Sequence, residues 1–168
     1  ARPDSFPRLA SVDSGALGCI RAGGQRVGER GKAPSYLDQA MILGIGVDVV
    51  EISRVRSMIA SQGERALLRL FTESEREYCG GMANPARHFA VRVAAKEAAF
   101  KALSGTDDAR GIGWREMEVE LDHIGRPSLR LHGRASARAK ELGVARSWIS
   151  LSHGDDLATA FVVLESSP

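Results

Sequence analysis

The segment "GIGVDVVEISRV", residues 44–55, places a carboxylate in the middle of an apolar strand. Apolar side chains recur there at every second position, the period of a β-strand: Ile45, Val47 and Val49. The other face of the strand then holds Gly44, Gly46 and Asp48. Because glycine has no side chain, we expect the two glycines to leave open space beside the Asp48 carboxylate.

Helices are predicted next along the chain. A helix over 53–71 follows the strand, with Ser53 as its N-cap. Thr72 and Glu75 have the S/T-x-x-E spacing of a capping box, so a second helix is expected to start at Thr72. An alanine-rich helix over 86–104 comes third.

Two hairpins complete the pattern. Apolar and polar residues alternate on both sides of turns at 124–127 and 153–156, with a short helix over 135–142 between the hairpins. The order β-α-α-α-β-β-α-β-β predicts an α+β fold, in which helices pack against an antiparallel sheet.

Composition narrows the class of protein. The content of 43% hydrophobic and 26% charged residues is that of a soluble globular protein, and no apolar run is long enough for a membrane span. Two cysteines give no disulfide framework, which favours a reducing, cytoplasmic compartment. The net charge of +2 lies in the first 40 residues, so the neutral remainder argues against a nucleic-acid binder.

The first 40 residues differ in composition from the rest of the chain. Residues 1–40 are rich in Gly, Pro, Ser and Arg without sustained periodicity, and we expect a disordered tail or non-native leader there. Met41 is a plausible natural start, which leaves one domain over residues 41–168.

The alanine-rich helix carries charges beside its apolar stripe. At 100° per residue the stripe comprises Phe89, Val93, Phe100 and Leu103. Lys96 falls inside it, Arg92 and Glu97 lie at its margins, and Lys101 follows one turn later. In one interpretation Glu97 and Lys101 form an ordinary surface pair and Lys96 is solvated. In the other, Arg92, Lys96 and Lys101 bind phosphate and Glu97 binds a metal.

Asp48 favours the second interpretation. One acid on a strand and one glutamate on a helix margin are the ligands that Mg²⁺ takes from proteins, together with waters and phosphate oxygens. The alternative is a structural Asp48, at a turn or paired with Arg54. His153 lies at the end of a predicted strand, and the sequence leaves both a structural and a functional role open for it. No shared spacing of histidines and cysteines indicates zinc, and nothing marks Cys79 as an activated nucleophile.

Four segments together carry a resemblance. "GIGVDVVEISRV", "FTESE", "RVAAKEAAFKAL" and "SWISLSH" follow one another as in the holo-acyl-carrier-protein synthases, and they span nearly all of residues 41–165. The chain therefore resembles the small, single-copy 4′-phosphopantetheinyl transferases. The resemblance implies the α+β fold of that family.

The resemblance also implies roles for individual residues. Asp48 and Glu97 match the acids that hold Mg²⁺ on the pyrophosphate of coenzyme A. The residues that match those holding coenzyme A phosphates and the acceptor are Arg92, Lys96, Lys101 and His153. Gly125 and Pro127 match a hairpin turn near the nucleotide. Arg54, with Met58 one turn later, starts the helix presented to the acidic carrier protein.

The reaction implied is attack by a serine of apo acyl carrier protein on the β-phosphate of coenzyme A. Lys101 and His153 would stabilise the transferring group, and Glu97, acting through a water, is the first candidate for general base. Family members usually form homotrimers with shared active sites. The alternatives are a Mg²⁺-dependent phosphohydrolase and a non-catalytic module that binds a carrier protein or nucleotide. The sequence does not distinguish fatty-acid from polyketide carriers, or Mg²⁺ from Mn²⁺.

Overall fold

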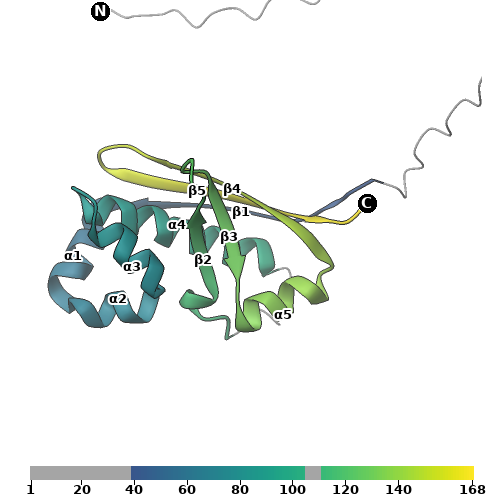
Figure 1. Cartoon of the computed structure of the whole chain (residues 1–168), viewed down its shortest axis with the longest axis horizontal. Coiled ribbons are helices and arrows are strands. Elements are labelled where there is room, and N and C mark those ends of the chain that lie inside the picture. Colours follow the sequence, from purple (N-terminus) through teal and green to yellow (C-terminus); the bar gives the residue numbers. More distant parts are fainter. Residues whose placement is uncertain (1–38, 105–110) are drawn as a thin grey trace, which may run out of the picture. The chain divides into compact units, whose positions relative to one another are not determined.

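The structure, a computed structural model, describes residues 39–104 and 111–168. These residues form a strand, helices, a hairpin, a further helix and a second hairpin (Figure 1). The bounds are β1 Ile42–Glu51, α1 Ile52–Gln62, α2 Glu64–Leu70, α3 Glu73–Gly80, α4 Pro85–Leu103, the 3-10 helix η3 Trp114–Glu116, β2 Met117–Leu121, β3 Pro127–Leu131, α5 Gly133–Glu141, β4 Val144–His153 and β5 Leu157–Ser166. The predicted α+β class is confirmed. The leader expected over 1–40 falls almost wholly outside the described residues and stays a prediction.

The helix expected over 53–71 is in fact two helices. Gly63 adopts φ 57°, a left-handed conformation that glycine reaches without steric cost, and the chain turns there between α1 and α2. The Gly63 N–H donates to the Ile59 carbonyl at 2.9 Å, which closes the last turn of α1. The N-cap of α1 is Glu51 rather than the expected Ser53, and its side chain makes no capping hydrogen bond.

The capping box predicted at the start of α3 is confirmed. The Glu75 N–H donates to Thr72 Oγ1 at 3.3 Å, and Glu75 Oε2 accepts from the Thr72 N–H at 3.0 Å. Two N–H groups that lack helical partners are thus satisfied, and α3 begins at Glu73.

Both predicted hairpins are confirmed, and the strands form two antiparallel sheets. One sheet has the order β1-β5-β4, and the other contains β2 and β3. In the larger sheet Asp48 lies opposite Ala160, while Val47 lies opposite Phe161. Successive residues of a strand point to opposite faces, so Asp48 and Val47 lie on different faces of this sheet. Each shares its face with the residue opposite it on β5.

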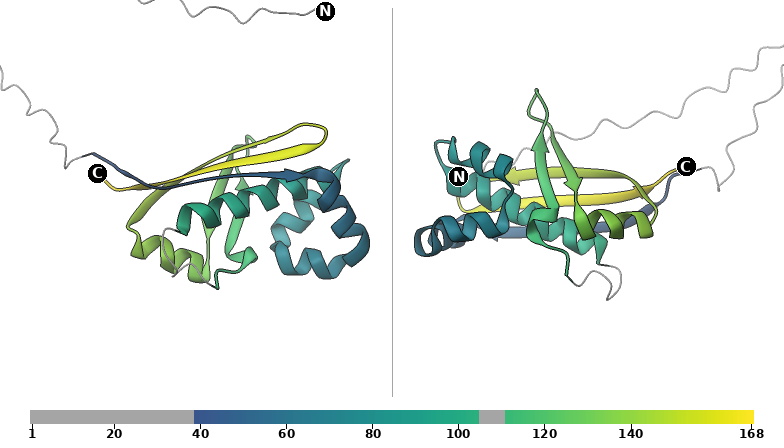
Figure 2. Two further views of the ribbon diagram at one scale, coloured as in Figure 1. Left: turned by 180° about the vertical axis from the view of Figure 1, so that it is seen from behind. Right: turned by 60° about the horizontal axis from the view of Figure 1, so that its bottom comes forward.

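Helix α4 packs against β1 and β5 on the Asp48 face of this sheet, and the described helices lie on that side (Figure 2). The glycines of β1 permit this contact. A Cβ on Gly44 would come 2.1 Å from the Ala102 carbonyl oxygen, and one on Gly46 would come 1.8 Å from that of Ala98. The expectation that the glycines leave open space beside Asp48 is therefore wrong, because the α4 backbone fills that space.

The opposite face of the sheet is apolar and uncovered by the described residues. Val47 is 52% exposed. Other large apolar side chains exposed on this face include Ile45, Val49, Trp148, Leu157 and Phe161. Among the described helices, none has the length and apolar character to cross a membrane.

Candidate active site

Asp48 and Lys101 meet where β1 packs against α4. The Lys101 Nζ lies 2.7 Å from Asp48 Oδ1 and donates to the Val47 carbonyl at 3.0 Å. The Asp48 side chain is mostly buried, whereas that of Lys101 is half exposed. Among the described residues, Asp48 therefore forms its ion pair with Lys101 rather than with Arg54, the partner considered in the alternative interpretation.

Glu97 lies one turn before Lys101 on α4. Partial burial raises the pKa of its carboxyl group, the Asp48 charge raises it further, and Lys101 opposes both effects. The Asp48 and Glu97 carboxylates are therefore close enough to interact electrostatically. The structure therefore brings Asp48, Glu97 and Lys101 together, although Asp48 and Lys101 are 53 positions apart in the sequence.

A cavity of about 560 Å³ opens beside these carboxylates. Asp48 and Glu97 both line it, and so do Arg54 and Met58 of α1, the two residues expected to face a carrier protein. Its remaining walls are mostly apolar: Val49, Val50, Val55, Leu70, Val93 and Trp114. The arrangement suits a ligand with a charged end at the carboxylates and an apolar part along the walls.

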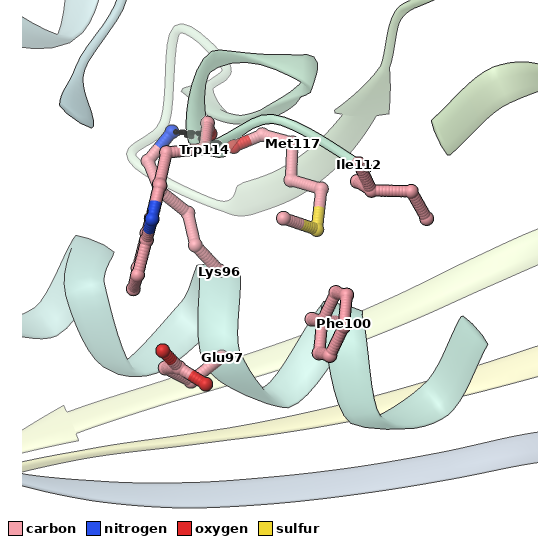
Figure 3. Close-up of a pocket in the computed structure, with 6 residues that line it drawn as sticks. All are labelled: Lys96, Glu97, Phe100, Ile112, Trp114 and Met117. Carbon is pink, nitrogen blue, oxygen red and sulfur yellow. Dashed lines mark hydrogen bonds between the residues drawn. The ribbon is translucent and has the colours of Figure 1, made fainter. Parts of the chain in front are cut away.

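A second cavity of about 220 Å³ adjoins the first (Figure 3). Glu97 and Trp114 line both cavities. The other residues of the smaller cavity are Lys96, Phe100, Ile112 and Met117. Figure 3 shows α4 as its floor, carrying Glu97, with Trp114 on the segment opposite. Trp114 is a wall residue of the site that no sequence motif indicated.

Lys96 does not join the expected phosphate-binding row. Its side chain is fully buried, and its Nζ lies 2.8 Å from Glu75 Oε2. The ammonium also donates to the carbonyls of Trp114, at 3.0 Å, and Met117, at 2.6 Å. An ammonium has three protons, so all of its donors are used within the protein. The prediction that Lys96 binds a coenzyme phosphate is therefore wrong, and so is the alternative of a solvated Lys96.

Arg92 and His153 belong to a separate cluster of rings at the start of α4. The Arg92 guanidinium lies 4.5 Å from the centre of the Tyr78 ring, and its Nε has no hydrogen-bond partner in the described part of the chain. The His88 ring contacts those of Tyr78 and His153, each with centroids 5.8 Å apart. Burial lowers the pKa of His88, as do the charges of His153 and Arg92. Neither Arg92 nor His153 lines the two cavities beside Glu97.

Gly125 and Pro127 lie at the β2–β3 turn, away from the lining of either cavity. Gly125 adopts φ 82°, which the turn requires, and Asp122 Oδ1 accepts from the Arg126 N–H at 2.8 Å. Their expected place near a nucleotide stays a prediction. Cys79 is buried, and burial raises the pKa of its thiol to about 11, whereas an activated thiol nucleophile has a lowered pKa.

The fold and the cluster of Asp48, Glu97 and Lys101 define an α+β protein with a charged site beside two cavities. The chain belongs to the 4′-phosphopantetheinyl transferase superfamily, whose family model matches residues 44–162.

Relatives named holo-[acyl-carrier-protein] synthase match it over nearly their whole length. That of Geotalea daltonii is 44% identical over 125 residues, which cover 74% of this chain and 99% of the relative. That of Alkalilimnicola ehrlichii is 48% identical over 128 residues, which cover 76% and 99%.

Solved structures of such synthases share the fold. The one from Neisseria meningitidis superposes with a TM-score of 0.67 at 30% identity, covering 75% of this chain and all of that chain, 100%. The one from Bacillus anthracis, solved in complex with CoA (3′,5′-ADP), has a TM-score of 0.61 at 33% identity, covering 76% and 99%.

Proposed function

We propose that this chain transfers the 4′-phosphopantetheine group of coenzyme A to a serine of apo acyl carrier protein. The serine oxygen forms a bond to the β-phosphorus, the bond between that phosphorus and the bridging oxygen breaks, and adenosine 3′,5′-bisphosphate leaves. The observation that carries this proposal is the 44% to 48% identity to holo-[acyl-carrier-protein] synthases over 99% of their length. A relative with a bound coenzyme A nucleotide supports the co-substrate.

Asp48 and Glu97 are the residues that would hold Mg²⁺. Carboxylate oxygens are the protein ligands this ion prefers. Partial burial and, after it, the Asp48 charge raise the pKa of Glu97, so a nearby cation would favour its ionised form. A bound Mg²⁺ supplies charge neutralisation on the pyrophosphate. Cation binding and the roles of both acids are proposals.

Lys101 would stabilise charge on the transferring phosphoryl group. Its half-exposed ammonium lies beside Asp48 and is held there by the Val47 carbonyl, so little reorganisation is needed when an anion arrives. Arg92 and His153 lie with the rings of Tyr78 and His88, outside the lining of both cavities, so their expected roles toward coenzyme A and the transferring group stay predictions. Glu97 is our candidate for receiving the serine proton through a water, because its raised pKa makes it a better base than an ordinary glutamate.

The carrier protein would dock at α1. Arg54 is exposed and Met58 is partly buried, and both line the larger cavity that also contains Asp48. An exposed arginine beside an apolar residue suits an acidic helical partner, since it offers steering charge and contact area. The target serine would then enter the cavity beside the carboxylates.

We infer a homotrimer from the uncovered sheet face. At least six large apolar side chains are exposed there on three adjacent strands, more than a monomer usually leaves in one patch. Association through this face would bury it between copies of the chain, and three-fold closure with shared active sites is part of this proposal. A cytoplasmic location, expected from the cysteine content, stays a prediction.

One assay tests the function. The purified protein is incubated with coenzyme A, Mg²⁺ and apo carrier protein, and the carrier is weighed by mass spectrometry. A gain of one phosphopantetheine group supports transfer. Phosphate release without a carrier would indicate a phosphohydrolase instead, and an unchanged carrier that still binds would indicate a non-catalytic module.

A further inference from the structure

The buried ammonium of Lys96 joins three elements. It forms an ion pair with Glu75 of α3, and it donates to the carbonyls of Trp114 in η3 and Met117 at the start of β2. Both charged side chains are essentially inaccessible, with Lys96 0% and Glu75 1% exposed. The contacts reach across 18 and 21 positions of chain, so they fix tertiary rather than local structure.

Both oxygens of the Glu75 carboxylate also accept hydrogen bonds within the protein. Its Oε1 accepts from the Val119 N–H of β2 at 3.1 Å, and its Oε2 accepts from the Thr72 N–H at 3.0 Å as well as from Lys96. One charged pair therefore connects α4, α3, η3 and β2. We call Glu75 and Lys96 the buried clamp.

The buried clamp lies next to the reacting groups without touching the larger cavity. Lys96 precedes Glu97 on α4, and the carbonyl it holds belongs to Trp114, which lines both cavities together with Glu97 (Figure 3). We propose that Lys96 and Glu75 are positioning residues of the transferase: they hold the Trp114 wall at a fixed place opposite Glu97. This inference rests on the proposed function of the Asp48–Glu97 site.

The choice of a charged pair supports a positioning role. A buried ion pair is seldom more stabilising than well-packed apolar residues of similar size, so stability alone does not explain this one. A lysine ammonium, however, holds two carbonyl oxygens in fixed directions, which an apolar side chain does not do. Removing both charges together should therefore leave a folded protein whose Trp114 wall is loose.

The test is the double variant Lys96→Met/Glu75→Gln, in which the glutamine retains an oxygen for the Val119 N–H. We expect a folded protein by circular dichroism whose kcat/KM for coenzyme A falls about 10- to 100-fold, the scale of a displacement near 1 Å in an active site. The matched control is Glu120→Gln/Arg130→Met, which removes an exposed pair with an N–O distance of 2.7 Å. Its kcat/KM should equal that of the wild type.

A spectroscopic readout separates positioning from mere stability. The chain has two tryptophans, Trp114 and Trp148, so Trp148→Phe leaves Trp114 as the single emitter. In that background, first checked for normal turnover, the double variant should make Trp114 fluorescence more accessible to acrylamide. A purely structural clamp would lower the Tm and leave both Trp114 quenching and kcat/KM of the folded protein unchanged, which would overturn the proposal.

A second variant decides the matter if the double variant does not fold. Trp114 is only partly buried, so Trp114→Ala should fold, and we expect its kcat/KM for coenzyme A to fall at least about 10-fold. Unchanged turnover in Trp114→Ala would show that no wall needs positioning. Failure of the proposed function is distinct, because wild-type protein would then add no mass to the carrier at all.

Discussion

The Lys101 ammonium lies 2.7 Å from Asp48 Oδ1, across the contact between α4 and β1. Glu97 sits one turn earlier on the same helix, and its pKa is raised by partial burial and then by the nearby Asp48 charge. Two carboxylates thus lie close to one ammonium, and Arg54 lines the same cavity as both of them. In the function proposed here, Asp48 and Glu97 would hold Mg²⁺, which would neutralise charge on the pyrophosphate.

The stability of the cation-free protein should depend on Glu97. A carboxyl group whose pKa is raised by folding binds more protons in the folded than in the unfolded state, so stability falls as pH rises from the unfolded pKa through the folded one. We expect Glu97→Gln to remove this loss and to be the more stable protein at neutral pH. Thermal unfolding across pH checks the prediction, and equal pH dependence in both proteins would contradict it.

Mg²⁺ provides the matched test at constant pH. A cation that binds only the folded state raises Tm with concentration, so Mg²⁺ should stabilise the wild type and have a weaker effect on Glu97→Gln. Identical Tm increases in the two proteins would show that Glu97 is no ligand. This measurement is independent of turnover.

Docking at α1 predicts a selective defect. Arg54→Glu reverses a charge at the mouth of the larger cavity, so we expect the KM for carrier protein to rise about 10-fold or more, with a smaller salt dependence of the rate. The KM for coenzyme A should stay near its wild-type value. Arg65→Glu on α2 is the control and should change neither constant. A carrier KM unaffected by Arg54→Glu would exclude α1 as the docking helix.

The close contact between β1 and α4 predicts intolerance at Gly46. A Cβ there would lie 1.8 Å from the Ala98 carbonyl oxygen, so Gly46→Ala must separate strand and helix. We expect a loss of about 3 kcal/mol or more in the free energy of unfolding. Gly80→Ala, at an open helical position of α3, is the control and should stabilise the protein by up to about 1 kcal/mol. Equal denaturant midpoints for the two variants would refute the close packing.

Local patterns predicted most of the fold. The Thr72–Glu75 capping box and the alternation around both turns depend on neighbouring residues, and the structure confirms them. The break at Gly63 was missed because a lone glycine inside a helical pattern is often tolerated. The period of β1 predicts that Gly44 and Gly46 share the face of Asp48. It does not predict that the α4 backbone packs against that face.

Only part of the site was predicted, because a sequence period places a residue on a face but does not identify its distant partners. Asp48, Glu97 and Lys101 meet as expected, since strand and helix periods placed each on a face. The helical period also put Lys96 in the apolar stripe, yet its partners Glu75 and Trp114 come from distant segments that no period connects. Burial of a lysine was foreseeable, and the identity of its acceptors was not.

The uncovered sheet face predicts assembly. Val47→Asp places a charge in the centre of this face, opposite Phe161, so we expect the molar mass from light scattering to fall from that of a trimer to that of a monomer. If active sites are shared, turnover should fall about 10-fold or more because one wall of each site is lost. Leu68→Asp, an equivalent change at an exposed position of α2, should alter neither. A fully active monomeric wild type would contradict the trimer.

The central claim is that Asp48 and Glu97 together carry phosphopantetheine transfer. The most direct measurement is the mass of apo carrier protein after incubation with coenzyme A, Mg²⁺ and either the wild type, Asp48→Ala or Glu97→Ala, each first shown to be folded. The wild type should add one phosphopantetheine group, and each variant should be slower by about 100-fold or more. The Asp48–Lys101 pair is partly exposed, so its loss should cost no more than about 1 kcal/mol of stability. Wild-type rates of mass gain in either folded variant would contradict the account.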